Sequence, residues 1–444
     1  MNRVVPAVVP AVVGALLVGG AVLGLTNCGG GEPSAPPPVP VAPKPPPAPA
    51  KVTPLPEVTP RPMEREAKLP QPIALSPKLK EARATLEQVV RRHALEPGNA
   101  WAIGHAMLAL GPEVQLTNGT KAVDYLFAEY AEWVQVDEER AVWFPRRRGA
   151  VRIEPHTDLL LKGITEGGIS PARDIAVDKQ LTVPAKLYQH SLYRAWFTPS
   201  ATGFDSFDDT PWALQGLAAW APDDLAWTAK GGHAMTMDDF THHAVEHIAT
   251  QSASLHQAAA KGVMPKKDCQ GIVGYSCGGQ HFVQGAAFAR ARGFGVDNDT
   301  AKLCAKRDLM RWRIDHELSS IDPLLQEHAR DVNVSTVLLN QRLKFLGHYL
   351  ETASKFGAYE LCPWTDADAA ALQRAADELV TTVTVIDSLG LWDDLEGKVR
   401  KNRALDPYRP TSGGAQQVFL DYLGDAAHAV RGIDLATGVG VVRY

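Results

Sequence analysis

Apolar residues recur at helical spacing along most of the chain. In residues 77–94, the apolar positions that fall on one helix face are Leu79, Ala82, Leu86, Val89 and Val90. Side chains three and four positions apart share a face of an α-helix, so this segment is expected to bury that face in a core. Residues 367–388 and 416–431 show the same spacing of small and aliphatic side chains. The pattern predicts a mainly α-helical body.

Alternation of the strand type is scarce. It is visible in residues 147–154 and 439–444, where we expect short strands. Residues 140–185 and 262–276 are expected to form long ordered loops. No period of about 34 residues appears, which disfavours tetratricopeptide repeats.

Proline usage divides the chain into three parts. Residues 1–28 contain 2 prolines, residues 29–76 contain 16, and the remaining 368 residues contain 15. Proline fixes φ and lacks a backbone donor, so a dense run favours an extended, solvated chain. We therefore expect a disordered, proline-rich stalk over residues 28–76 and one folded domain over residues 77–444. The net charge of −5 gives no support for a basic face, which argues against nucleic-acid binding.

The N-terminus has the pattern of an export signal. Arg3 precedes residues 4–26, which carry no charged side chain. The segment ends in Leu25-Thr26-Asn27-Cys28, which resembles the lipobox of bacterial lipoproteins. Asn27 departs from the small residue that usually precedes the cysteine of that motif.

The lipobox resemblance implies how the protein is anchored. Residues 1–27 would be removed as a signal peptide, and Cys28 would be acylated and inserted into a membrane. Gly29 stands where an aspartate would retain a lipoprotein at the inner membrane, so the resemblance implies an outer-membrane location, facing the periplasm or the cell surface. The alternative is an uncleaved N-terminal anchor helix. In both cases the body lies in the cell envelope, outside the cytoplasm.

The other four cysteines are expected to form disulfides, because exported proteins are usually oxidised. Pairing Cys269 with Cys277 and Cys304 with Cys362 is the simplest of the three arrangements. The competing hypothesis is a zinc site in which Cys277 and His281, four positions apart, supply two ligands. No cofactor is otherwise expected.

Histidines recur beside glycines at what we expect to be the heads of apolar helices. The instances are Gly104-His105, Gly232-His233, Cys277-Gly278-Gly279-Gln280-His281, Gly347-His348 and, more loosely, Ala427-His428. A glycine at a helix start opens space beside the histidine. If each helix is the inner member of a hairpin, the histidines converge on one centre, as in an α/α toroid. We therefore expect a central cavity lined by His105, His233, His281 and His348.

Four short segments also carry a resemblance. They are residues 101–110, Thr210–Leu214, Ser276–His281 and Gly347–Glu351. They look like the landmarks of an uncharacterised group of bacterial envelope proteins, which resemble α/α toroids of the prenyltransferase or terpene-cyclase type. The similarity spans roughly residues 95–355. It implies a fold and no particular activity.

Tryptophans and carboxylates point to a carbohydrate site. Seven of the ten tryptophans lie between residues 101 and 227, and exposed indoles stack on sugar rings. The candidate substrate-binding residues are Trp101, Trp212 and His233. Carboxylates and imidazoles can transfer protons during glycoside cleavage. The candidate acid–base residues are His105, Asp209, His281, His348 and Glu351.

Simpler interpretations compete with this site. The tryptophans would pack in the core, and Asp208 or Asp209 would cap the helix that begins at Pro211. A single histidine or glutamate of this kind more often has a structural role, with its hydrogen bonds satisfied by neighbouring groups, than a catalytic one.

A further pattern, His243-Ala244-Val245-Glu246-His247, resembles the motif of the inverzincin metallopeptidases. His243 and His247 share a helix face and could bind zinc, with Glu317 as a third ligand. The simpler interpretation is an amphipathic helix rich in histidine, because five histidines lie between positions 233 and 256.

Three hypotheses for function follow. The leading one is a lipid-anchored envelope toroid of unknown specific activity that acts on or binds polysaccharide through its histidine-lined cavity; if it is an enzyme, we expect a carbohydrate hydrolase or lyase. The second is a non-catalytic envelope protein that binds a glycan or a protein. The third is a zinc peptidase.

Overall fold

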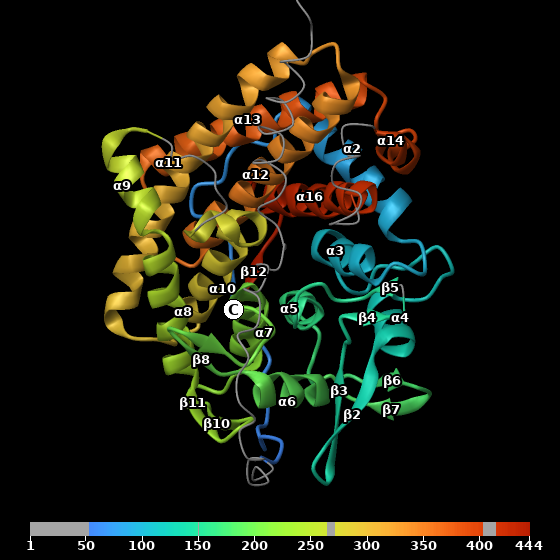
Figure 1. The fold of residues 1–444 in the computed structure, drawn as a ribbon, viewed down its shortest axis with the longest axis vertical. Coiled ribbons are helices and arrows are strands. Elements are labelled where there is room, and N and C mark those ends of the chain that lie inside the picture. Colours follow the sequence, from blue (N-terminus) through green and yellow to red (C-terminus); the bar gives the residue numbers. More distant parts are fainter. Residues whose placement is uncertain (1–52, 150, 264–270, 403–413) are drawn as a thin grey trace, which may run out of the picture.

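The computed structural model describes residues 53–149, 151–263, 271–402 and 414–444, with backbone alone for 414–417. The body is mainly helical and carries small two-stranded antiparallel sheets, as Figure 1 shows. The mainly helical prediction is therefore confirmed. The predicted signal peptide and Cys28 lie outside the described residues, as do Cys269 and residues 28–52 of the predicted stalk.

The helices, in chain order, are α2 (Pro77–Ala94), α3 (Ala100–Leu110), α4 (Ala122–Tyr130), α5 (Leu159–Glu166), α6 (Ala185–Arg194), α7 (Thr210–Trp220), α8 (Met237–Gln251), α9 (Ala253–Lys261), α10 (Gln280–Ala291), α11 (Asp297–Glu327), α12 (Val332–Ala358), α13 (Asp366–Ser388), α14 (Leu395–Lys401) and α16 (Gly414–Ala436). The strands pair as β1 (Glu66–Ala67) with β12 (Val442–Arg443), β2 (Glu132–Val136) with β3 (Glu139–Trp143), β4 (Arg147–Arg148) with β5 (Val151–Arg152), β6 (Ile175–Val177) with β7 (Gln180–Thr182), β8 (Phe197–Thr198) with β9 (Ala201–Thr202), and β10 (Ala226–Ala229) with β11 (His233–Thr236).

Local sequence explains several of these elements. The Ser76 side chain caps α2 by accepting from the Leu79 N–H, and Pro77 occupies the first helical position, where a missing donor costs nothing. All five apolar positions predicted for one face of α2 are buried. The predicted helices over 367–388 and 416–431 appear as α13 and α16, and the predicted strands contain β4, β5 and β12. The predicted loop over 140–185 is wrong, since it contains α5 and two hairpins.

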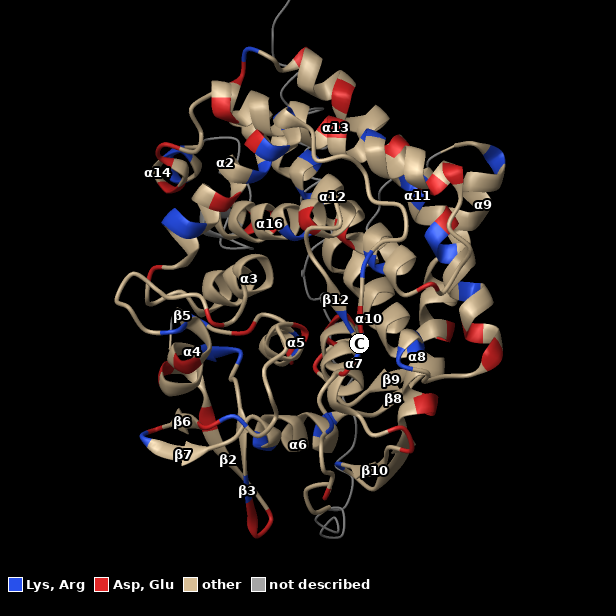
Figure 2. Cartoon of the chain, turned by 180° about the vertical axis from the view of Figure 1, so that it is seen from behind, with Lys and Arg blue, Asp and Glu red and all other residues tan. Residues whose placement is uncertain are grey.

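Within the described residues, α3, α5, α7, α10, α12 and α16 pack in a closed sequence around the middle of the body. Each of these helices packs on the next, and α16 packs back on α3. The view from behind in Figure 2 shows the same helices around the centre. Other helices lie against this sequence: α2 packs on α3 and α16, α8 on α7 and α10, α11 on α10 and α12, and α13 on α12. We call α3, α5, α7, α10, α12 and α16 the inner helices.

The crossing of α12 and α16 depends on glycine. A Cβ added at Gly347 would lie 3.0 Å from the backbone nitrogen of Ala429, and one added at Gly432 would lie 2.9 Å from the carbonyl oxygen of Gly347. These glycines therefore let two helices approach closely, and they do not mark helix starts. His348 lies in the interior of α12 and His105 in the interior of α3, so the prediction that they head helices is wrong. His281 does lie in the first turn of its helix, α10.

The described part of the predicted stalk, residues 53–76, packs against the body. Leu55 and Leu69 are buried, and the segment pairs with the C-terminus through β1 and β12. The Arg61 N–H donates to the Trp220 carbonyl, and the Ile73 N–H donates to the Ala436 carbonyl. Residues 53–76 therefore contact the body, because leucines between the prolines bury apolar surface and several backbone N–H groups donate to the body.

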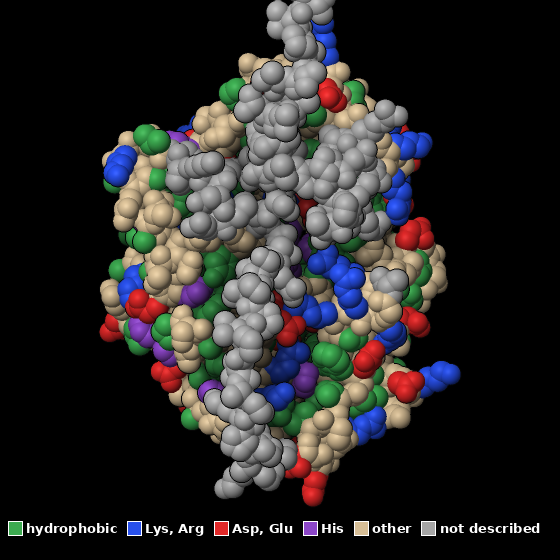
Figure 3. Space-filling model, in the orientation of Figure 1, with side chains coloured by type: hydrophobic (Ala, Val, Ile, Leu, Met, Phe, Trp, Pro, Cys, Tyr) green, Lys and Arg blue, Asp and Glu red, His purple; other side chains and the backbone are tan. Residues whose placement is uncertain are grey.

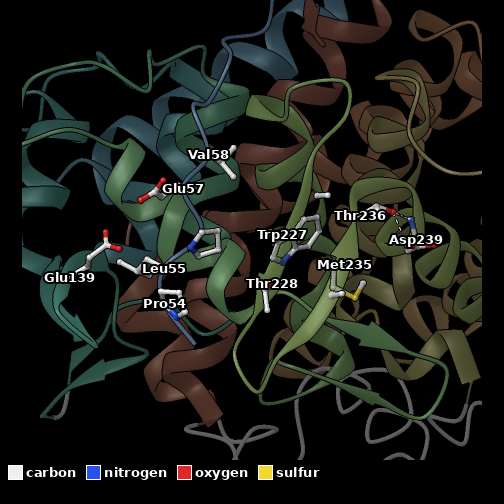
Figure 4. Close-up of a pocket in the computed structure, with 13 residues that line it drawn as sticks. Pro54, Leu55, Glu57, Val58, Glu139, Trp227, Thr228, Met235, Thr236 and Asp239 are labelled. Atoms are coloured by element: carbon white, nitrogen blue, oxygen red, sulfur yellow. Dashed lines mark hydrogen bonds between the residues drawn. The ribbon is translucent and has the colours of Figure 1, made fainter. Parts of the chain in front are cut away.

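A pocket of about 670 Å³ lies where this segment meets the β10–β11 hairpin. Figure 4 shows Leu55 and Val58 on one side of the pocket, and Trp227 and Met235 on the other. The searched part of the body, which is the part described, contains no helix that is both long and apolar enough to span a bilayer.

Candidate functional site

A row of aromatic rings crosses the middle of the body. In order, its members are His156, Trp212, His281, His348, His428, His105 and Trp101. Successive ring centroids are separated by 4.2, 4.8, 5.0, 4.0, 5.5 and 3.9 Å. Apart from His156, which precedes α5, the members lie on the inner helices α3, α7, α10, α12 and α16. We call this set the aromatic row.

Burial holds three imidazoles of the row, those of His105, His281 and His348, in the neutral form. Burial lowers the pKa of His105 to about 3, and it lowers the pKa values of His281 and His348 well below the ordinary range. The Nδ1 of His348 lies 2.9 Å from the Lys344 carbonyl, which can only accept, so the hydrogen resides on Nδ1 and the Nε2 keeps a lone pair.

A buried charge network lies beside the row. Lys355 of α12 donates to Glu351 at 2.6 Å and lies 2.7 Å from Glu166 of α5. Lys162, one turn before Glu166, lies 3.6 Å from it. Burial alone would raise the pKa of Glu166, but Lys355 and Lys162 lower it to about 2. The two glutamates are therefore ionised, as the adjacent buried lysines require.

Glu351 also orients His428. The Glu351 Oε2 accepts from His428 Nδ1 at 2.6 Å. Burial would raise the pKa of Glu351, but Lys355 and His428 hold it well below its usual range. In the described part of the chain, the Nε2 of His428 has no hydrogen-bond partner although it is buried. An imidazole with one nitrogen fixed by a carboxylate and the other unengaged has the arrangement of a general base.

A second carboxylate–imidazole pair lies at the other end of the row. Asp209 Oδ1 lies 3.5 Å from His156 Nδ1 and accepts from the Thr157 N–H at 3.2 Å. Burial would raise the pKa of Asp209, but its contacts with His156 and Arg146 lower it. The Nε2 of His156 lies 3.0 Å from Ser276 Oγ. The His156 side chain remains 20 % exposed, so the row reaches the surface at this end.

The predicted capping role of the aspartates is not observed. Asp209 makes no side-chain cap to α7. Asp208 instead accepts from the Ser276 backbone N–H at 2.8 Å and from the Ser276 hydroxyl at 2.7 Å. The pair of aspartates therefore fastens the turn before α10 and His156 onto the start of α7.

The structure brings together most of the residues proposed from sequence. His105, His281, His348, Trp101 and Trp212 all belong to the aromatic row. Glu351 contacts the row through His428, and Asp209 contacts it through His156. The indoles of Trp101 and Trp212 are buried against imidazoles, so they form the wall of the site and do not present open faces for a sugar to stack on.

His233 is the exception among the predicted cavity residues. It lies on strand β11 and stacks on Trp196 with ring centroids 4.2 Å apart. Its glycines, Gly231 and Gly232, have positive φ and form the hairpin turn between β10 and β11. The prediction that His233 lines the centre is therefore wrong, because its Gly-His pair belongs to a turn.

The site also contains residues that sequence reasoning missed. His428 is a looser match to the predicted pattern and is not among the residues expected to line the cavity; Gly424 lies one turn before it, and a Cβ there would lie 2.6 Å from Trp101. His156 lies in irregular backbone between β5 and α5, where no periodicity marks it. Helical spacing of glycine and histidine is the signal that would have found His428.

The predicted peptidase ligands do not form a site. Among the described residues, two groups of side chains are close enough to share a metal ion: Cys277 with His281 and His348, and His242 with Glu246 and Asp299. Neither group includes the predicted ligands His243, His247 and Glu317. His247 lies 2.5 Å from the Tyr275 hydroxyl, and Glu317 accepts from Arg313 at 3.0 Å. The resemblance to the inverzincin motif therefore does not correspond to a metal centre here.

The cysteines agree with the predicted pairing in part. Cys304 and Cys362 form a disulfide, as expected. Cys277 is a free thiol, and its expected partner, Cys269, lies outside the described residues. The Cys277 backbone is left-handed (φ 51°, ψ 36°), and burial raises the pKa of its thiol.

Charged and polar groups surround the exposed end of the row. Arg146 donates to Asp205 at 2.6 Å and to the Pro155 carbonyl at 2.5 Å, and it lies 3.4 Å from Asp209. Lys344 lies 3.4 Å from Asp421. Figure 3 shows Lys, Arg, Asp, Glu and His side chains gathered near the middle of one face.

Comparison with known proteins found no matching family, no matching curated protein and no matching solved structure. The resemblances to lipoproteins and to α/α toroids therefore stay predictions.

Proposed function

We propose that the protein is an envelope-anchored α/α toroid that acts on a polysaccharide by acid–base chemistry at the aromatic row. The observation that carries the proposal is the His428–Glu351 pair. It supplies an oriented imidazole with an unengaged nitrogen, at the point where the inner helices meet.

The packing of the inner helices supports the toroid. A toroid of helical hairpins would require such a closed sequence, with other helices packed outside it, and this packing supports the proposal. Each inner helix also contributes to the candidate site: α5 supplies Lys162 and Glu166, and the other five supply the row. This contribution from every inner helix favours a single central site.

The chemistry of the exposed end supports a hydroxyl-rich ligand. Ser276, Asp208 and Arg146 place a hydroxyl, a carboxylate and a guanidinium beside His156. Such groups hydrogen-bond to sugar hydroxyls and to anionic sugar substituents. The Cys304–Cys362 disulfide supports the envelope location, because stable disulfides are typical of compartments outside the cytoplasm.

The test is turnover of bacterial surface polysaccharides by the purified protein. Peptidoglycan and both neutral and anionic capsular polysaccharides are incubated with it. New reducing ends report hydrolysis, and ultraviolet absorption by unsaturated sugar reports elimination. His428→Gln should lower the rate by at least about 100-fold, the contribution typical of a general acid or base.

A matched control is His316→Gln. The His316 ring packs against the Trp312 ring, and its Nδ1 hydrogen-bonds to the Trp312 carbonyl. His105 makes the same two contacts with Trp101. His316, however, lies on α11, outside the inner helices. Both variants are checked by helical circular dichroism. Full turnover in His428→Gln would refute the catalytic assignment. Binding of a polysaccharide without turnover by the wild type would favour the non-catalytic alternative.

A further inference from the structure

One cluster within the aromatic row has the donor set of a metal centre. Cys277, His281 and His348 each offer a ligand atom, and these atoms all lie within 4.8 Å of one another. They come from separate places in the fold: the turn before α10, the first turn of α10, and the middle of α12. Two imidazole nitrogens and a thiolate are a ligand set that favours zinc over hard cations such as magnesium.

The two histidines face each other in the geometry that a shared metal imposes. Their Nε2 atoms are 3.3 Å apart. Two nitrogens bound tetrahedrally at about 2.0–2.1 Å from zinc are separated by roughly 3.3 Å. As a direct hydrogen bond the contact is long for nitrogen donors, and it would require one ring to carry its hydrogen on Nε2.

The hydrogen positions agree with metal binding. His348 donates its Nδ1 hydrogen to the Lys344 carbonyl, so its Nε2 lone pair points toward His281. Metal-bound histidines commonly hold their second nitrogen in this way, which fixes the tautomer and the ring orientation. His281 is also buried, and among the described residues its Nδ1 has no hydrogen-bond partner. Placing its hydrogen there leaves the Nε2 of His281 free to bind a metal as well.

We propose that Cys277, His281 and His348 bind one zinc ion and leave its fourth position open. Zinc requires a nitrogen–sulfur separation of roughly 3.5 Å, and the ligand atoms lie within 4.8 Å of one another, so a nitrogen–sulfur separation has to shorten by about 1.3 Å at most. Binding deprotonates the Cys277 thiol and releases one proton to solvent. Three protein ligands with an open position are the pattern of a catalytic zinc site, in which water or substrate completes the shell.

The second group, His242 with Glu246 and Asp299, is a weaker candidate. Lys302 pairs with Glu246, and Asp299 accepts from His242 at 2.9 Å. Lys302, paired with Glu246, supplies positive charge of the kind that a metal would bring. The group is therefore complete as an ion-pair network.

Cobalt substitution tests the proposal without any substrate. Purified protein is stripped with a chelator, dialysed against zinc and measured for bound metal, and a parallel sample is loaded with Co²⁺. The wild type should retain about one zinc per chain. Its cobalt form should show the near-ultraviolet absorption of a thiolate–cobalt bond, and Cys277→Ser should lose this band.

Variants separate a bound metal from a structural contact. His281→Gln and His348→Gln should each weaken zinc binding by more than the roughly 10–100-fold that loss of an outer partner causes. His105→Gln, a buried member of the same row, should retain full affinity. If a histidine variant fails to fold, Cys277→Ser still decides the question, because serine preserves the size of the side chain.

Three outcomes would overturn the proposal: a wild type that binds no zinc after dialysis, full zinc retention by Cys277→Ser, or a cobalt form without the thiolate band. This inference does not depend on the polysaccharide substrate. A His428→Gln variant that keeps zinc but loses turnover would support both proposals. A zinc-binding protein without turnover would support this one alone.

Discussion

Removing the disulfide between Cys304 and Cys362 should destabilise the body strongly. The bond joins the first half of α11 to the segment after α12 and closes a loop of 58 residues. Cross-linking a loop of this length restricts the unfolded chain by an entropy worth about 4 kcal/mol at 25 °C. The double variant Cys304→Ser/Cys362→Ser should therefore lose about 4 kcal/mol of unfolding free energy, measured by urea titration of the helical circular dichroism signal.

Reduction of the wild type supplies the control. The reduced wild type should unfold at the same urea concentration as the double variant, because both lack the cross-link. A reductant should leave the double variant unchanged. A difference below about 1 kcal/mol between oxidised and reduced wild type would show that the loop is already constrained in the unfolded state, and it would refute the entropic reasoning.

Three other changes probe the packing and the buried charges. Lys355→Met removes the cation between Glu166 and Glu351, and it should cost about 3–5 kcal/mol in urea unfolding because two buried carboxylates lose their partner; a loss under 1 kcal/mol would contradict this. Burial lowers the pKa of His190 in the folded state to about 3, whereas the pKa of the unfolded histidine is near 6.5. The stability that comes from burying the neutral His190 ring is therefore fully present above pH 6.5. It is lost as the pH falls toward 3, because the unfolded chain then binds a proton that the folded chain does not. His190→Gln should therefore flatten the fall in stability between pH 6.5 and 4 by up to about 1.4 kcal/mol per pH unit, and an unchanged slope would refute it. Gly347→Ala should push α16 from α12 and lower the free energy of unfolding by about 1–3 kcal/mol in the same assay, whereas an unaltered midpoint would show that the crossing can relax.

The spacing of apolar residues made the helices predictable, because residues three and four positions apart lie on the same face of a helix. The buried face of α2 follows directly from this rule. The convergence of His105, His281 and His348 was predictable as well, but only His281 follows glycines at a helix start, because His105 and His348 lie inside their helices. In Gly104-His105 and Gly347-His348, the glycine instead lies where two helices approach closely.

Contacts between residues far apart in the chain explain the features that the sequence did not predict. His156 enters the site because Asp208 and Asp209 hold its segment against α7 and the turn before α10, which is a relation between residues far apart in the chain. His233 has the same local Gly-His pattern as the central histidines but belongs to a hairpin. The packing of residues 53–76 depends on apolar grooves that exist only after the body has folded.

The position of α16 has a consequence for the order of folding. This helix packs on α2, α3 and α12, and the pairing of Arg83 with Asp434 joins residues 351 positions apart. Contacts between residues this far apart in the chain form slowly, because closing so long a loop costs conformational entropy before any favourable contact is made. A chain interrupted after α14 would lack His428 and leave the apolar faces of α2, α3 and α12 uncovered. Such a product should be an aggregation-prone intermediate and a target for proteases, so the candidate site and the completed core should appear in a single late step.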